Sequence, residues 1–139
     1  MATTVTSAQN NTATNFQNQN MEIGTFIGEM FSFNSAIKLY HWHVSGPGSY
    51  AQHIAIDQAL ETLLDVIDRI TETTYALKGD ISITIPETKT PTDIVKFASD
   101  FYSYVEKHRD LFSEDMSESI IDDYQEAIQQ LIYRLARLK

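Results

Sequence analysis

Three of the four histidines of this chain lie within thirteen positions, on either side of a Gly-Pro-Gly break. His41 precedes the break, whereas His53 and Asp57 follow it, four residues apart. Asp68 and Glu72 repeat that spacing further along the chain. Residues four apart share one face of a helix, and imidazoles and carboxylates gathered in this way are the ligands that a hard or borderline divalent metal ion needs. The pattern predicts a metal site made of these five residues.

The two acidic pairs cannot serve one ion within a single chain. Asp57 and Asp68 are eleven residues apart, which is about 16 Å along a helix axis. In an antiparallel two-fold pair of this helix, residues face each other when their position numbers have a constant sum. His53 with Glu72 and Asp57 with Asp68 both sum to 125. We therefore predict two equivalent sites at a dimer interface, with His41 joining each from the preceding helix.

Each feature also has a simpler interpretation. An inward-facing histidine such as His41 is often a hydrogen-bonded core residue. An acidic pair at i, i+4 spacing is usually a solvated helix face, which is the interpretation we favour for Glu61 and Asp65. The combination of five ligand-type residues with the two-fold solution favours the metal site.

The elements that must hold these residues are helical. Residues 1–20 are rich in Asn, Thr and Gln and contain a single Phe, so they cannot bury enough apolar area to offset their ordering entropy. We predict a flexible polar arm over residues 1–20 and a bundle over residues 21–139. Apolar residues at three- and four-residue steps predict its helices: about 21–45, 50–77, 90–111 and 115–139. Leu64 is among the apolar positions of the second helix. Gly79 can cap the end of that helix, and Thr90 can be the N-cap of the third, with Pro91 at its first position.

The connections indicate how the helices are arranged. The breaks after the first and third helices are short, so each of these helices should lie antiparallel to the next. The segment from Gly79 to Thr90, extended at ~3.3 Å per residue, spans roughly 40 Å, close to the length of the second helix. Ile81, Ile83 and Ile85 alternate within it and could lay one face on the bundle or on a neighbouring chain. The fold class we predict is all-α, a ferritin-like four-helix bundle with a long crossover between helices two and three.

Composition excludes several classes of protein. The chain has no cysteine, which excludes disulfides and thiolate-based metal sites. A formal net charge of −9 opposes general binding to nucleic acids or anionic membranes. No apolar run approaches the ~18 residues that a membrane span needs, and residues 1–20 lack the pattern of a secretory signal. We expect a cytoplasmic protein with no membrane partner.

The ligand-type residues also resemble a known family. His41-Trp42, His53-x-x-x-Asp57 and Asp68-x-x-x-Glu72 are similar to the ferroxidase signature of the Dps mini-ferritins, the DNA-binding proteins from starved cells. The detailed match covers roughly residues 38–76. The resemblance implies a hollow homo-oligomer, a dodecamer, that binds Fe(II) at intersubunit sites. It also implies oxidation of Fe(II) to Fe(III) with peroxide or dioxygen and storage of the ferric mineral inside.

Residues other than the metal ligands also have candidate roles, and some features of the chain differ from the Dps family. Trp42 adjoins the site and is a candidate electron donor, or an interface or core tryptophan. Asp115, Glu118 and Asp122 are candidates for an iron-entry pore, or simply favourable charges at a helix N-terminus. His43 stands where the family usually has Asn, and the chain is short for the family.

The sequence is also compatible with two other functions. One is a DNA-compacting protein, supported only by the basic residues Arg134, Arg137 and Lys139, since the arm lacks the lysines and arginines with which many family members grip DNA. The other is a structural shell protein that keeps the ligand residues without turnover.

We expect DNA affinity to be weak and to vanish at physiological salt, because this acidic surface can neutralise too few phosphates to release many counterions. A DNA shift assay at low salt and at about 150 mM salt measures this directly. A retained shift at the higher salt would contradict the prediction.

Overall fold

The chain is all-α. The computed structural model describes the backbone of residues 2–137 and the side chains of residues 15–137, and no strand occurs within them. The four α-helices and one short 3-10 helix are α1 (Ala2–His43), α2 (Ser49–Lys78), α3 (Ile94–His108), η1 (Arg109–Leu111) and α4 (Asp115–Arg137). Four helices agree with the prediction, whereas Leu138 and Lys139 lie outside the described residues. No helix within residues 2–137 combines the length and apolarity of a membrane span.

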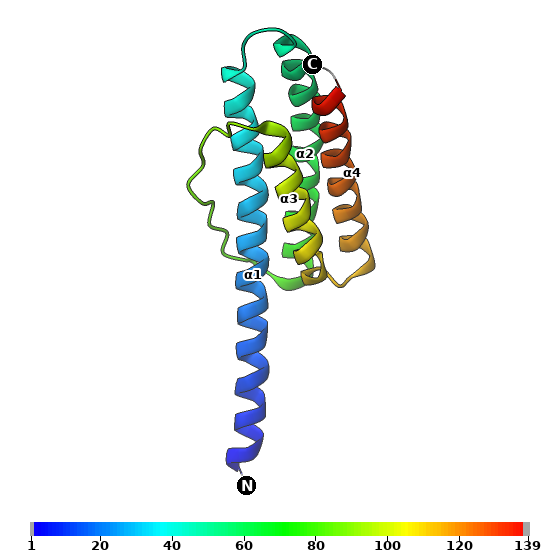
Figure 1. The fold of residues 1–139 in the computed structure, drawn as a ribbon. Helices are drawn as coiled ribbons and strands as arrows, with labels where there is room; N and C mark the ends of the chain where they lie inside the picture. Colours follow the sequence, from blue (N-terminus) through cyan, green and yellow to red (C-terminus); the bar gives the residue numbers. More distant parts are fainter. Residues whose placement is uncertain (1, 138–139) are drawn as a thin grey trace.

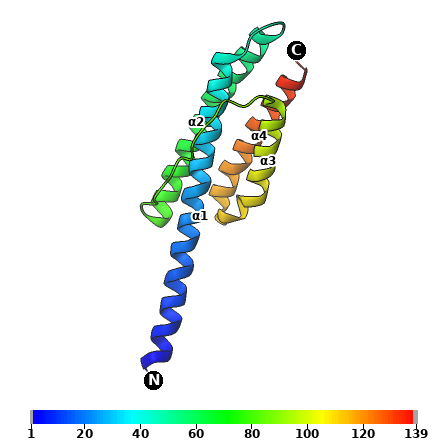
Figure 2. The same ribbon diagram turned by 60° about the vertical axis from the view of Figure 1, so that its left-hand side comes forward.

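The helices pack side by side as a bundle. α1 packs against α2 and α3, and α4 packs against α2 and α3. Figures 1 and 2 show that each helix runs antiparallel to the neighbours it packs against, with the short turns at opposite ends of the bundle. Each helix therefore contributes one apolar stripe to a common interior.

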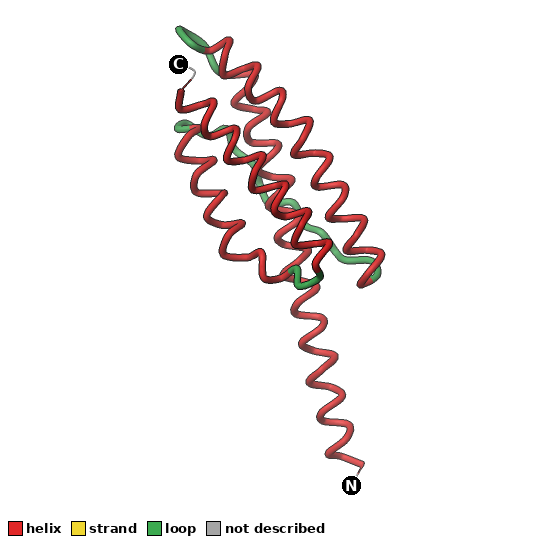
Figure 3. Tube along the Cα trace, turned by 90° about the vertical axis from the view of Figure 1, so that its right-hand side faces the viewer, coloured by secondary structure: helices red, strands yellow, loops and turns green. Residues whose placement is uncertain are grey.

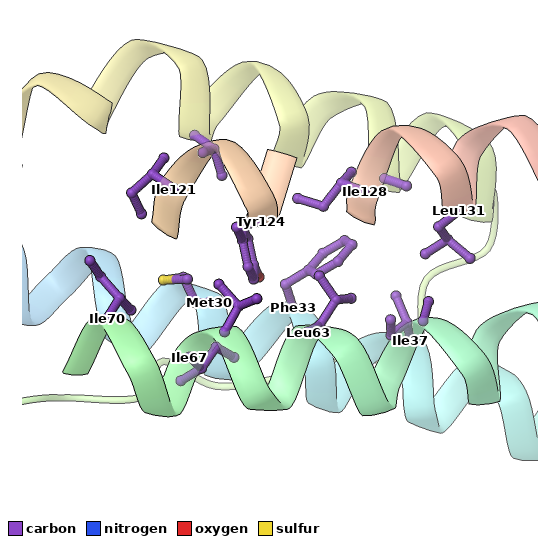
Figure 4. Packing of buried hydrophobic residues seen from close by; sticks show 14 of the residues in the cluster. Met30, Phe33, Ile37, Leu63, Ile67, Ile70, Ile121, Tyr124, Ile128 and Leu131 are labelled. Carbon is purple, nitrogen blue, oxygen red and sulfur yellow. The ribbon is translucent and has the colours of Figure 1, made fainter. Parts of the chain in front are cut away.

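That interior is mainly apolar, with a few buried polar side chains such as Asn34 and Thr74. The stripe predicted on the first helix is buried, from Ile23 to His41. Figure 4 shows Phe33, Leu63 and Tyr124 pointing toward one another from three different helices. Leu64, an apolar position of the second helix, is 48% exposed. The face of α2 that packs in the core carries Leu63 and Ile67 instead.

The first helix begins earlier than predicted. We expected it to start at Met21, but α1 extends back to Ala2 and runs past the other helices (Figure 1). Residues 1–20 contain neither Gly nor Pro, and elongating a packed helix needs no new nucleus, so nothing in the sequence ends the helix at Met21. Among the side chains that the structure describes, from residue 15 onward, the first buried one is that of Ile23. The division into a polar arm and a bundle stays a prediction.

Two helix ends show how local chemistry sets the boundaries. Gly79 ends α2 with a positive φ of 82° and donates its N–H to the Tyr75 carbonyl at 2.9 Å, as the predicted C-cap requires. The prediction that Thr90 is the N-cap of the third helix, with Pro91 at its first position, is wrong. Asp93 is the N-cap, because its carboxylate accepts the free N–H of Lys96 at 3.1 Å.

The segment between α2 and α3, residues 79–93, runs along α1 (Figure 3). Ser32 Oγ and Thr88 Oγ1 lie 2.9 Å apart, and Ile81 is buried whereas Ile85 is exposed. Two glycines make the close approach possible. A Cβ at Gly24 or Gly28 would stand only 2.0 Å from the carbonyl oxygen of Ser82 or Thr84, respectively.

Substituting Gly24→Ala should destabilise the fold, because the added methyl group meets a backbone carbonyl that cannot rotate away. Alanine's better helix propensity offsets about 1 kcal/mol at most, and we expect a net loss of about 1–3 kcal/mol in the free energy of unfolding, measured with denaturant. Ser35→Ala, at an exposed position of the same helix, is the control and should be near neutral. Equal stability of both variants would contradict the close packing.

Candidate metal centre

The site forms where α1 and α2 meet at their shared turn. Gly46 and Gly48 adopt φ values of 92° and 79°, a left-handed conformation that other residues rarely adopt. This turn reverses the direction of the chain within five residues, so α2, which begins at Ser49, runs back along α1. His41 on the last turns of α1 is thereby brought against His53 and Asp57 on the first turns of α2.

His53 is oriented by the end of α1. Its Nδ1 lies 3.2 Å from the backbone carbonyl oxygen of His41, one of the last four carbonyls of the helix, which lack partners within it. A carbonyl can only accept, so Nδ1 carries the proton and Nε2 keeps its lone pair. A backbone carbonyl on one ring nitrogen is the usual way in which a metal-ligating histidine is held.

His41 is buried, with Asp57 beside its ring. Only 5% of His41 is exposed, and among the described residues neither of its ring nitrogens makes a hydrogen bond of normal geometry. Its ring stacks on that of His53 with 3.6 Å between the centroids. Nε2 lies 3.1 Å from Asp57 Oδ1 without the geometry of a hydrogen bond. A buried polar group without a partner is costly, and a cation between these atoms would satisfy it.

The protonation states suit metal binding. Burial, and next the charge of Lys38, lower the pKa of His41, so its imidazole is neutral at pH 7. A hydrogen bond from Lys38 lowers the pKa of Asp57, so its carboxylate is ionised. Neutral imidazole and ionised carboxylate are the forms in which His41 and Asp57 would bind a metal ion.

Three of the five predicted ligands therefore meet in one chain. Ligand atoms of His41, His53 and Asp57 all lie within 4.8 Å of one another, so the group could hold a metal ion. Two nitrogen donors and one oxygen donor suit borderline divalent ions such as Fe(II) or Zn(II). Three ligands leave coordination positions open for further ligands.

Asp68 and Glu72 do not join this group in the chain. Both side chains are exposed on α2, and the metal-binding cluster found within the described residues contains neither. This agrees with the axial separation of the two pairs along one helix. Their place in a site completed by a second chain stays a prediction.

The interior of the bundle offers no alternative site. Where other four-helix proteins hold metals between facing helices, this chain places residues such as Met30, Ile67 and Tyr124 (Figure 4). The Tyr124 hydroxyl is buried without a partner, and burial raises the pKa of Tyr124 well above its usual value. The metal centre therefore lies at the edge of the bundle.

The neighbouring residues have different surroundings. Trp42 is 69% exposed, so it is not a core tryptophan, and its role as electron donor is a proposal. His43 is exposed as well. Lys38 was not among the predicted site residues, but it contacts both Asp57 and the Trp42 ring. Its position three residues before His41, on the same side of the helix, could have indicated this role.

The three pore candidates lie on the first turns of α4. Asp115 and Glu118 are exposed, whereas Asp122 pairs with Arg109. Arg109 also donates to Gln125, so it ties the end of α3 to α4. This ion pair gives Asp122 a partner within the fold, and an entry pore stays a proposal.

A model of a protein family described as "Family of unknown function (DUF5856)" matches residues 41–135, more than half of the chain. The matched region begins at His41 and contains the other four predicted ligands. No curated protein and no solved structure matches the chain.

The imidazole of His41 should titrate below its ordinary pKa of 6.5 in the metal-free protein. The unfolded chain then binds more protons, so the stability contributed by burying neutral His41 is present above about pH 6.5 and decreases as the pH falls through that value.

Lys38 lowers the pKa of His41 and Asp57 raises it. Lys38→Met should therefore raise the pKa of His41, and Asp57→Asn should lower it.

Imidazole C–H chemical shifts followed by NMR measure these changes. Lys96→Met, which removes a solvent-exposed ion pair with Asp100, is the control and should leave the titration of His41 unchanged. A shift in the same direction in both site variants would contradict the arrangement described here.

Proposed function

The chain belongs to the DUF5856 family, and we propose that it is an iron-oxidising and iron-storing mini-ferritin of the Dps type. Fe(II) is its substrate, bound at sites shared between two chains. Peroxide or dioxygen takes the electrons, and a hollow oligomer, most simply a dodecamer, retains the ferric product.

The observation that carries the proposal is the group of His41, His53 and Asp57. Its ligand atoms lie close together, and the buried imidazole of His41 among them makes no well-formed hydrogen bond, in a chain whose net charge is −9. Such a group attracts cations, and the combination of imidazole and carboxylate suits iron. These three residues belong to the sequence motif that resembles the Dps signature.

The exposed acidic pair supports a site shared by two chains. Asp68 and Glu72 lie on α2, the helix that carries His53 and Asp57. A two-fold axis between Thr62 and Leu63 would bring each pair to the other chain's complementary pair, since both position sums equal 125. Leu64, exposed beside that axis, would be covered by the second chain.

The path of the chain supports a ferritin-like assignment. α1, α2, α4 and α3 form a ring of neighbours, and residues 79–93 return along α1 before α3 begins. A long connection between the second and third helices distinguishes ferritin-like bundles from simple up-down-up-down bundles.

The proposed chemistry is metal-centred redox chemistry. Each Fe(II) gives up one electron, so two Fe(II) reduce one peroxide, with two protons, to two waters. Asp57, and the carboxylates of Asp68 and Glu72 from the second chain, favour Fe(III) over Fe(II) because they compensate its additional positive charge. His41 and His53 orient the ion without adding charge.

Addition of Fe(II) under anaerobic conditions, followed by peroxide or dioxygen, should give ferric-oxo absorbance in the near ultraviolet faster than in protein-free buffer. A structural shell without turnover would bind iron and show no acceleration, and that outcome would overturn the proposed function.

Mixing variants tests whether each site is shared by two chains. His53→Ala with Asp57→Ala in one chain, and Asp68→Ala with Glu72→Ala in another, should each abolish fast oxidation, because every site lacks one pair of ligands. In a mixed dimer one site inherits all four substitutions and the other inherits none. Co-assembled particles should recover roughly a quarter of wild-type activity for random pairing.

The control for mixing is the Asp100→Ala and Glu126→Ala double variant, which removes two exposed carboxylates on α3 and α4, outside the metal group and not on α2, the helix of the proposed two-fold axis. It should retain oxidation. Co-assembly confirmed by mass spectrometry without any recovery of activity would rule out the two-chain site.

A further inference from the structure

A lysine forms an ion pair with the carboxylate of the candidate metal centre. Lys38 Nζ lies 3.2 Å from Asp57 Oδ1 and donates a hydrogen bond to it. The same oxygen lies 3.1 Å from His41 Nε2. The ammonium group therefore takes up the Asp57 oxygen that faces the buried imidazole, where a bound ion would need it.

We propose that Lys38 is the counter-ion of the empty centre, and that its ammonium group neutralises Asp57 until a divalent cation displaces it. This inference rests on the metal centre of the proposed function. It assigns Lys38 a role in setting the affinity of the site, with no part in the oxidation itself.

The exposure of the pair indicates that the ammonium group can be displaced. The Lys38 and Asp57 side chains are 37% and 47% exposed, and ion pairs at such positions are weak because water screens them. A divalent ion carries twice the charge and gains two imidazole ligands in addition. A monovalent ion has no such advantage over the tethered ammonium, so Lys38 favours divalent over monovalent cations.

The displaced ammonium group has a place to go. Lys38, Asp57 and Trp42 line the same surface pocket, with a volume of about 610 Å³. Lys38 Nζ already lies 5.5 Å from the centroid of the Trp42 ring, within the range of a cation–π contact. Release from Asp57 would leave the Trp42 ring, and the Glu61 carboxylate that lines the same pocket, as partners for the ammonium group.

Trp42 is the single tryptophan of the chain, so its fluorescence reports on this movement. Zn(II) is a suitable probe because it binds the same ligand types and undergoes no redox reaction. Binding is measured by calorimetry and by Trp42 fluorescence at about pH 8, where histidine is deprotonated and protons do not compete with the metal.

Lys38→Met should bind Zn(II) about two- to five-fold more tightly than the wild type, because the metal no longer competes with an ammonium group. Lys38→Gln, which is also neutral, repeats the test with a polar side chain if the methionine variant does not fold. Lys38→Arg keeps the charge and should not tighten binding. Lys96→Met removes a lysine from an exposed pair with Asp100 and should leave the affinity unchanged.

Fluorescence provides a second readout. Zn(II) should change the Trp42 emission of the wild type, and this change should be much smaller in Lys38→Met, even though the variant binds more tightly. Zn(II) binding by both neutral variants that is equal to or weaker than that of the wild type would overturn the inference. So would a Zn(II)-induced change in Trp42 emission that is as large in Lys38→Met as in the wild type.

The two proposals fail in different ways. Tighter Zn(II) binding by the neutral variants, in a protein that does not accelerate iron oxidation, would support the role of Lys38 and contradict the proposed oxidase. Fast iron oxidation with no effect of Lys38 on binding would contradict only the inference. Absence of Zn(II) binding in every variant would overturn the metal centre and the inference together.

Discussion

The tight reversal between α1 and α2 is the constraint on which the site depends. Because Gly46 and Gly48 adopt positive φ values, the last turns of one helix lie directly against the first turns of the next. His53 can then bond the carbonyl of His41, which satisfies the end of α1 and sets the tautomer of the imidazole. One contact thus serves both the fold and the site, and a longer or looser turn would remove both effects.

The sequence predicts much of this fold because apolar periodicity and turn residues act locally. The stripe from Ile23 to His41 and the glycine cap at Gly79 follow from such patterns. The start of α1 does not, because polar composition disfavours packing without breaking a helix. The N-cap of α3 was misplaced because Thr90 and Asp93 are both good caps, and only the path of the incoming chain decides between them.

The candidate site was predictable to a similar degree. The spacing of His53 and Asp57 indicates a shared helix face, with His41 expected to join from the preceding helix, and these three residues meet in the structure. Lys38 was not predicted, because a lysine on a helix is ordinarily a solvated charge, and only the tertiary pairing of α1 with α2 brings it to Asp57. The contribution of Asp68 and Glu72 depends on a second chain, so it follows from position sums and from no contact within one chain.

The packed interior of the bundle has a consequence for the rate at which ions would exchange. Residues such as Leu63, Ile67 and Tyr124 fill the space between the helices, so an ion would reach His41 and Asp57 from the outer edge of the α1–α2 hairpin. Entry and departure then require no separation of the helices and no local unfolding. The lifetime of a bound ion is set by its own ligand bonds and by whatever covers that edge, independently of how stably the bundle is folded.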